Sequence, residues 1–191
     1  MELYIARHGE TEFNVEGRMQ GNGKDSPLTP NGIQQAKHLG ESLAGITFDA
    51  VYSSPLKRAT NTVEIAFGGT LKPILDPRLV EIGLGAAEGM LWEDVQYMFP
   101  EARISDPVSY IPPPQAEQLP DMIARVSAFL DDLAKTGHKQ VFVLTHGFTL
   151  RVFQACTMGK SLEALGQARH YKNCEVVHYQ YSQGKWEEKT C

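Results

Sequence analysis

The chain has 191 residues, of which 42 % are hydrophobic and 21 % are charged, and its formal net charge is -5. These values are ordinary for one globular domain, which at this length buries a core without disulfides or a structural metal. The acidic balance argues against a broad basic surface, so we expect neither nucleic acid nor an anionic membrane as a partner. A small anionic ligand remains compatible, because a local group of arginines can bind phosphate in an acidic protein.

Cys156, Cys174 and Cys191 are far apart in the sequence and form no C-x-x-C pair. This spacing predicts neither a disulfide framework nor a zinc site, and it indicates reduced thiols in a cytoplasmic protein. The first apolar run, residues 3–6, is too short for a signal peptide and has no basic start. No stretch reaches the roughly 18 apolar residues of a membrane span. The oligomeric state cannot be read from the sequence.

Residues 3–6 are followed by Arg7-His8-Gly9, a pattern typical of a buried strand that stops in a loop. Residues 14–30 are rich in Gly, Asn, Asp and Pro, which predicts a long ordered loop. Such loops are uncommon in compact domains unless they are functional. Thr29-Pro30 then has the pattern of an N-cap followed by proline, and apolar residues at helical spacing continue that helix to Gly45.

The next part of the chain repeats this order of strand and helix. We predict a strand at 48–53, a helix opened by Ser54-Pro55 and ended by Gly68-Gly69, a strand at 73–75 and a glycine-rich loop at 83–89.

Residues 90–119 are the least regular segment, rich in proline and with one short helix expected near 92–98. We interpret the segment as a lid over the substrate and not as a linker, because the chain after residue 119 is too short for a separate domain of the usual size. Tyr110 and the prolines 112–114 are candidates for shaping the leaving-group pocket. We therefore predict a single domain, 1–191, with residues 90–119 as a specificity excursion.

The C-terminal part carries the clearest patterns of helix and strand. We predict an amphipathic helix at 121–134, a strong strand at 140–144, a helix at 148–158 and a final strand at 175–181. Strands that alternate with helices predict an α/β sheet with helices on both faces. In such sheets ligands bind beyond the carboxyl ends of the strands.

Charged side chains follow the ends of these strands. Arg7 and His8 end the first strand, and His146 ends the strong one; Arg58 lies in the first turn of a helix and Glu81 follows the third strand. Taken singly, each is more often a structural or surface residue. A cation in a first helical turn opposes the macrodipole by up to about 1 kcal/mol. That placement is favourable if an anion binds there, so the convergence at one edge indicates a phosphate site.

At this edge the chain resembles the histidine phosphatase superfamily, also called phosphoglycerate mutase-like. The short matches follow the family's order over roughly residues 3–177 and together are specific. They lie in residues 3–11, in Asn14, in 17–21, 25–32 and 51–59, in 79–85 with Glu88-Gly89, and in 143–147.

The resemblance implies a three-layer α/β/α sandwich on a mostly parallel central sheet, and a phosphohistidine intermediate. His8 matches the nucleophile and Glu81 the proton donor to the leaving group. The residues matching the phosphoryl contacts are Arg7, Asn14, Gln20, Arg58, His146 and Gly147.

These roles fit the chemistry of the residue types. A neutral imidazole is a good nucleophile, and fixed donors stabilise the charge that a transferring phosphoryl group spreads over its oxygens. Glu81 can protonate the leaving group if burial keeps it protonated. The sequence has no H-E-x-x-H motif, P-loop or G-x-S-x-G elbow, so we expect no metal or other cofactor, no nucleotide-type phosphate loop and no serine hydrolase.

Three functions remain open at this point. The first is a metal-independent phosphomonoester phosphatase acting on a small phosphorylated metabolite, favoured by the short chain and the Gln20-Gly21 form of the loop. The second is a phosphoglycerate mutase-type phosphoryl transfer, and the third is a non-catalytic module that binds a phospholigand. Ala87, where many relatives have an aromatic residue, and the stretch 21–24 depart from the family pattern.

Overall fold

The computed structural model describes residues 1–103 and 105–189. Over this part of the chain the centre is a six-stranded sheet in the order β3-β2-β4-β1-β5-β6. Its first four strands pair in parallel, whereas β5 runs antiparallel to β1 and β6 antiparallel to β5. The strands are β1 Glu2–Arg7, β2 Ala50–Ser53, β3 Ile74–Leu75, β4 Gln140–Thr145, β5 Val176–Ser182 and β6 Lys185–Glu188.

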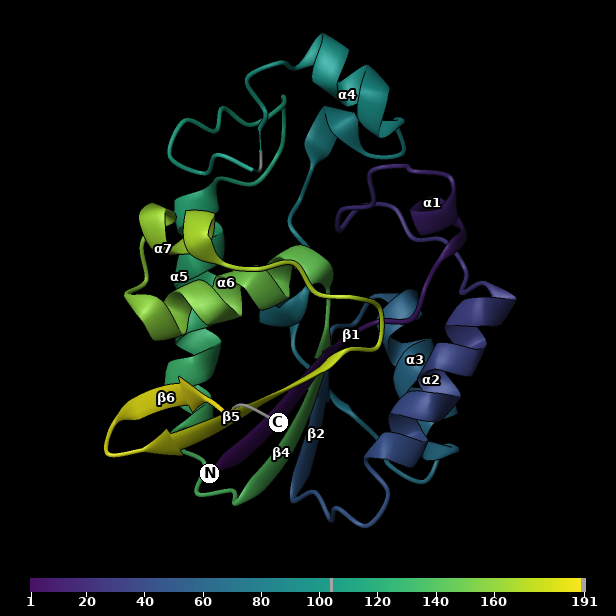
Figure 1. Ribbon diagram of the computed structural model, residues 1–191, viewed down its shortest axis with the longest axis vertical. Coiled ribbons are helices and arrows are strands. Elements are labelled where there is room, and N and C mark those ends of the chain that lie inside the picture. The colour runs from purple at the N-terminus through teal and green to yellow at the C-terminus, as the bar shows by residue number, and fades with distance from the viewer. Residues whose placement is uncertain (104, 190–191) are drawn as a thin grey trace.

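Helices cover both faces of the sheet, as Figure 1 shows, with α2 and α3 on one side and α5 and α6 on the other. The predicted three-layer, mostly parallel α/β fold is therefore confirmed. The helices are α1 Glu12–Val15, α2 Pro30–Ser42, α3 Lys57–Phe67, α4 Trp92–Met98, α5 Leu119–Leu133, α6 Gly147–Met158 and α7 Leu162–Gln167, with 3-10 turns at Pro77–Leu79 and Gly85–Ala87.

The two central strands supply side chains to both layers because their residues alternate in direction. In β1, Leu3 and Ile5 join the core under α5 and α6, and Ala6 joins the core under α2 and α3. Strand β4 alternates in the same way. Burial on both faces explains why these segments read as continuous apolar runs in the sequence.

The predicted start of α3, the helix that follows β2, was wrong. Ser54 does not cap it, because α3 begins at Lys57 with Leu56 in the N-cap position and no side-chain cap. The Ser54 N–H donates to the carbonyl of Leu144 at 3.0 Å, so residue 54 still continues the sheet hydrogen bonding. Its hydroxyl lies 2.7 Å from a ring nitrogen of His146.

Some short elements were not predicted. Helix α1 begins just before the expected 14–30 loop and takes its first two residues, held by a capping box between Thr11 and Asn14. Helix α7 is capped by Ser161, and β6 forms a hairpin with β5 through Gln183 and Gly184, which both have positive φ. Each of these elements is too short to produce a clear apolar period, so only its caps and turn residues could indicate it.

Among its described residues, the excursion 90–119 contains α4 as predicted and is otherwise irregular up to α5. In Figure 1 it lies beyond the carboxyl ends of β1 and β4. Phe99 and Tyr110 pack against the core under α5 and α6, whereas Tyr97 and Met98 are exposed. No helix of the described residues is long and apolar enough to cross a bilayer.

Candidate active site

Three predicted site residues meet where β1 and β4 end. The His8 N–H donates to the carbonyl of Thr145 at 2.9 Å, which joins the two strand ends. The rings of His8 and His146 lie 5.2 Å apart between centroids, and Arg58 Nε is 3.2 Å from His146 Nδ1. All three side chains are buried. The parallel topology therefore brings together residues that are far apart in the sequence.

The imidazole of His8 is held as a neutral ring with one bare nitrogen. Its Nδ1 lies 2.7 Å from the carbonyl oxygen of Gly9, which can only accept, so Nδ1 carries the hydrogen and Nε2 has the free lone pair. Burial first, and then the charges of Arg58 and Arg7, hold the pKa of His8 well below its ordinary 6.5. The ring is thus ready to act as a nucleophile at neutral pH.

Arg7 is anchored at one end of its guanidinium and has a donor left over. Nη1 donates to the carbonyl of Tyr171 at 2.9 Å, whereas the buried Nε has no hydrogen-bond partner within 1–103 and 105–189. A Cβ at Gly147 would stand only 3.2 Å from this Nε. The absence of a side chain at residue 147 therefore gives the guanidinium its room beside the start of α6.

Arg58 is anchored by four acceptors. Nη1 pairs with Asp25 Oδ1 at 3.0 Å and donates to the carbonyl of Lys24 at 3.3 Å, and Nη2 donates to the carbonyl of Gly21 at 2.9 Å. The fourth acceptor is Nδ1 of His146, which accepts from Nε of Arg58 at 3.2 Å. Asp25 is the only carboxylate paired with Arg58 within the described part of the chain, so it is the counter-ion that accompanies this buried charge.

His146 is the N-cap residue of α6, and both of its ring nitrogens are engaged. Nδ1 faces the Nε–H of Arg58, and Nε2 lies 2.7 Å from Ser54 Oγ. Burial, followed by the charge of Arg58, lowers the pKa of His146 well below 6.5, so the ring is neutral. A direct contact between this ring and a phosphoryl group stays a prediction.

Glu81 is buried and lies against the N-terminus of α6. Its Oε1 accepts from the N–H of Ile82 at 3.0 Å and from the N–H and hydroxyl of Thr149 at 3.1 and 3.2 Å. Oε2 accepts only from the N–H of Phe148, at 3.1 Å, among the residues that the structure describes. Oε2 is therefore the oxygen with acceptor capacity left for a proton.

Asn14 lies in α1 and Gln20 on the loop after it, and both amide oxygens accept hydrogen bonds. Asn14 Oδ1 accepts from the N–H of Thr11 at 3.2 Å and from Asn173 Nδ2 at 3.3 Å. Gln20 Oε1 accepts from the Thr11 hydroxyl at 2.8 Å, and its Nε2 donates to Ser26 Oγ at 3.1 Å. This arrangement leaves the Asn14 amide N–H groups, and one N–H of Gln20, available to an anion.

The structure adds residues that the sequence reasoning did not select: Asp25, Ser54, Thr62, Thr149 and Asn173. Thr62 Oγ1 accepts from the N–H of Gly9 at 3.1 Å, and Asn173 Nδ2 donates to the carbonyl of His8 at 2.9 Å. Asn173 is near because β5 runs antiparallel to β1, so its amino end lies beside the carboxyl end of β1. A sequence pattern does not give strand direction, and so no signal pointed to Asn173.

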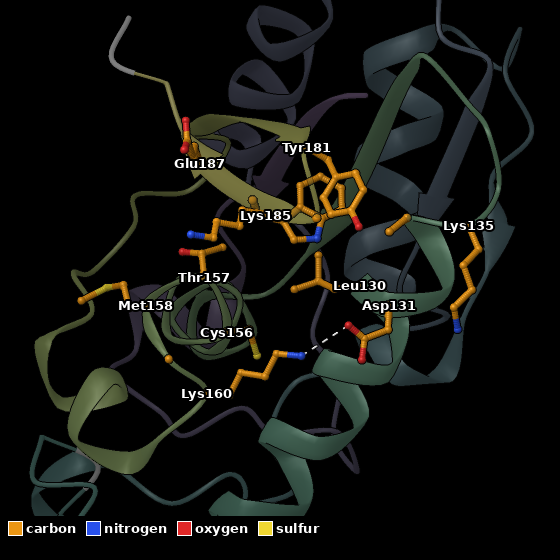
Figure 2. A pocket seen from close by; sticks show the side chains of 14 residues that line it. Leu130, Asp131, Lys135, Cys156, Thr157, Met158, Lys160, Tyr181, Lys185 and Glu187 are labelled. Atoms are coloured by element: carbon orange, nitrogen blue, oxygen red, sulfur yellow. Dashed lines mark hydrogen bonds and ion pairs between the residues drawn. The ribbon is translucent and has the colours of Figure 1, made fainter.

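A wide cavity lies elsewhere in the molecule. It has a volume of about 960 Å³ and lies between α5, the end of α6 and the β5–β6 hairpin. Figure 2 shows Lys160 directed toward Asp131, with a 3.3 Å ion pair between them. The N–H of Tyr181, one of the lining residues, donates to the carbonyl of Met1, so this cavity is at the end from which β1 starts. It contains none of the predicted site residues.

No group of three or more His, Cys, Asp and Glu side chains is arranged to hold a metal ion in residues 1–103 and 105–189. The titratable cluster at the strand ends consists of two arginines, two neutral imidazoles and the carboxyl groups of Glu81 and Asp25. The forked donors of the two arginines suit the oxygens of an anion such as phosphate.

Comparison with known proteins adds independent findings. Residues 3–191 match the family described as the histidine phosphatase superfamily, branch 1. The chain is 35 % identical over 166 residues to phosphoserine phosphatase 1 from Hydrogenobacter thermophilus, across 85 % of this chain and 78 % of that protein. It is 31 % identical over 200 residues to the probable phosphoglycerate mutase GpmB from Proteus mirabilis, across 97 % and 87 %. The solved structure of Bacillus stearothermophilus YhfR is similar with a TM-score of 0.89 and 34 % identity, covering 98 % of this chain and 94 % of that one.

Proposed function

Since this chain belongs to the histidine phosphatase superfamily, branch 1, we propose that it is a metal-independent phosphomonoester phosphatase acting through a phosphohistidine at His8. Its substrate is a small phosphorylated metabolite. The observation that carries the proposal is the state of His8: a buried, neutral imidazole with a bare Nε2, beside two arginines. The acceptor at Nδ1 fixes this state before any substrate binds.

Binding places the phosphoryl oxygens among donors that the fold already orients. Arg7 offers its unpartnered Nε, and Arg58 Nη2 has a second N–H beyond the one that Gly21 accepts. Asn14 and Gln20 add amide N–H groups, and the backbone at Gly147 adds the start of α6. Fixed donors of this kind stabilise the charge of the transferring group with little reorganisation.

In the first step, His8 Nε2 attacks phosphorus while the bond from phosphorus to the ester oxygen breaks. The bonding electrons leave with that oxygen, and Glu81 Oε2 supplies the proton that makes it a neutral alcohol. In the second step, water attacks phosphorus and Glu81 takes the water proton. The N–P bond then breaks, which releases phosphate and restores the neutral imidazole.

The same proposal assigns the segment 90–119 to covering the leaving group, within a single domain of residues 1–191. Two backbone bonds tie the end of this segment to the stretch after Glu81: Ala86 N to the carbonyl of Pro114 at 2.9 Å, and Glu117 N to that of Gly83 at 2.8 Å. The buried hydroxyl of Tyr110 has no partner in the described residues. The free thiols Cys156 and Cys174 fit a reducing, cytoplasmic location.

A phosphoglycerate mutase-type transfer is the second candidate, favoured by the identity to the probable mutase GpmB. A mutase must keep water away from the phosphohistidine, and that task needs more covering chain than a phosphatase does. The short excursion and the identity to a phosphoserine phosphatase support hydrolysis. A non-catalytic phospholigand module is the third candidate, and the intact charged positions argue against it.

The test is phosphate release from a generic aryl phosphate in the presence of chelator, with a denaturing quench at alkaline pH to trap phosphohistidine. We expect release between pH 5 and 8 and an acid-labile label that is absent in His8→Ala. His38→Ala, which removes an exposed histidine, is the matched control. Failure of both release and labelling would reject the enzyme, and interconversion of 3-phosphoglycerate faster than any hydrolysis would establish the mutase.

A further inference from the structure

Ser54 makes a buried contact to the site that the proposed mechanism does not use. Its side chain is 0 % exposed, and its Oγ lies 2.7 Å from Nε2 of His146, which is also 0 % exposed. On the far side of that ring, Nδ1 lies 3.2 Å from Nε of Arg58. The three side chains thus form a chain from the end of β2, through the start of α6, to the first turn of α3.

The chemistry of the end members determines where the histidine proton is. An arginine Nε is always a donor, so Nδ1 of His146 must be the acceptor. The neutral ring then carries its hydrogen on Nε2 and donates it to Ser54 Oγ. Ser54 also accepts from the N–H of Leu56 at 3.3 Å, which fixes the hydroxyl where the ring needs an acceptor.

We propose that Ser54 is a positioning residue: it holds His146 in the Nε2–H tautomer, and this tautomer orients Arg58 toward the phosphoryl group. The inference rests on the proposed function, because it concerns the geometry of the same anion site. Without Ser54 Oγ, the Nε2–H has no buried acceptor, and the Nδ1–H tautomer becomes favourable. Nδ1–H then faces the Nε–H of Arg58, so two donors oppose each other and the guanidinium turns away.

The neighbouring Ser53 provides a matched control. It is also 0 % exposed and is the last residue of β2, but its hydroxyl donates to the carbonyl of Ser54 at 2.9 Å and is hydrogen-bonded to neither histidine among the described residues. Ser53→Ala and Ser54→Ala therefore remove equally buried hydroxyls, of which only one reaches His146. A purely structural role would make the two variants behave alike.

The experiment combines the imidazole ¹⁵N spectrum with binding of inorganic phosphate. In Ser54→Ala we expect the His146 signals to change from the Nε2–H to the Nδ1–H pattern. We also expect phosphate to bind about tenfold more weakly, as when a buried donor is left unpaired. With the aryl phosphate, KM should rise more than kcat falls. Ser54→Thr keeps the hydroxyl and should restore the Nε2–H tautomer of His146. If Ser54→Ala does not fold, the near-isosteric Ser54→Cys replaces it and should show the changes expected of the alanine variant.

Two results overturn the inference. One is an unchanged His146 tautomer in both the alanine and the cysteine variants. The other is an equal loss of phosphate affinity in Ser53→Ala. The test is separate from that of the proposed function, because the tautomer and phosphate affinity are measured without turnover. If the wild-type protein hydrolyses no substrate but Ser54→Ala still changes the tautomer of His146, the phosphatase proposal is rejected and the role of Ser54 is retained.

Discussion

At the scale of single residues, the site depends on two imidazoles that the protein keeps neutral in different ways. His8 gives its only N–H to the carbonyl of Gly9 and keeps Nε2 bare. His146 gives its N–H to Ser54 and accepts from Arg58, so neither nitrogen is free. Of these two rings, His8 is therefore the one that we propose as the nucleophile. In the sequence His8 and His146 look alike, because each precedes a glycine. Their hydrogen-bond partners in the structure distinguish the roles that we propose for them.

The nucleophile is tested by His8→Ala. We expect turnover to fall by about 10³-fold or more, as when a covalent nucleophile is removed. The fold should survive, because the substitution leaves the contact between the ends of β1 and β4 in the backbone. The measurements are phosphate release and the circular dichroism spectrum. Substantial activity in this variant would rule out the covalent route.

The protonation of His8 predicts the acid side of the rate profile. Because its pKa is well below 6.5, the imidazole should stay a nucleophile as the pH falls through 6.5 and lose activity only at lower pH. The measurement is the rate of phosphohistidine formation from an aryl phosphate, corrected for the fraction of dianionic substrate. A half-maximal rate at about 6.5, the ordinary histidine value, would contradict the prediction.

At the scale of elements, the start of α6 organises the site. His146 is its N-cap, Gly147 leaves room for Arg7, and the next two backbone N–H groups hold Glu81. The carboxyl group of Glu81, the proposed acid, thus satisfies donors that every helix leaves open at its first turn. The carboxyl group of Glu81 is both the proposed proton donor and the acceptor for the first free N–H groups of α6. A change of Glu81 must therefore affect the start of this helix as well.

Glu81→Gln tests this coupling. The amide removes the transferable proton, and its NH₂ group opposes a backbone N–H at the start of α6. We expect phosphohistidine formation from alkyl phosphates to slow much more than formation from an aryl phosphate, whose phenolate leaves without protonation. Unfolding free energy should fall by about 1–3 kcal/mol, because a buried donor loses its acceptor. Glu88 lies outside the first turn of α6, so Glu88→Gln is the control variant. An equal loss of rate with alkyl and aryl phosphates in Glu81→Gln would exclude the role of Glu81 as the acid.

Most long elements were predictable from the sequence, and the reasons are visible in particular elements. Helix α5 has seven buried residues on one side, and β4 is buried from its second residue onward, so their apolar periods are strong. The start of α3 was wrong because the hydroxyl of Ser54 contacts a histidine 92 residues further along the chain. A cap motif is local, and a distant partner can take its hydroxyl.

At the scale of the whole molecule, the sequence predicted which segments meet but not the direction of the last strands. The sequence placed five residues at the carboxyl ends of parallel strands, and the structure brings them to one edge of the sheet: Arg7, His8, Arg58, Glu81 and His146. Asn173 and the carbonyl of Tyr171 reach the same edge only because β5 reverses direction. Pairing direction depends on the whole sheet, and no local pattern encodes it.

Acid should destabilise the whole fold through the two buried histidines. Both have folded pKa values well below 6.5, so below pH 6.5 the unfolded chain binds protons that the folded chain does not. The free energy of unfolding therefore falls with decreasing pH, by a limiting slope of about 1.4 kcal/mol per pH unit for each ring. Urea unfolding at pH 7.5 and 5.5 measures this loss.

His8→Gln should lose less stability between these two pH values than wild type does, because one titrating ring is gone. His38→Ala should match wild type, since that side chain is exposed. An identical pH dependence in wild type and His8→Gln would show that the buried ring does not contribute.

Strand β1 ends directly before His8, the proposed nucleophile, and has a hydrogen-bonded neighbour on each side, β4 and β5. Its amide hydrogens should therefore exchange with solvent only through opening of the sheet's centre, which is the slowest class of exchange in a fold. In increasing denaturant, we expect activity and β1 protection to be lost together and not in sequence. The reactive imidazole is thus attached to the part of the molecule that opens last.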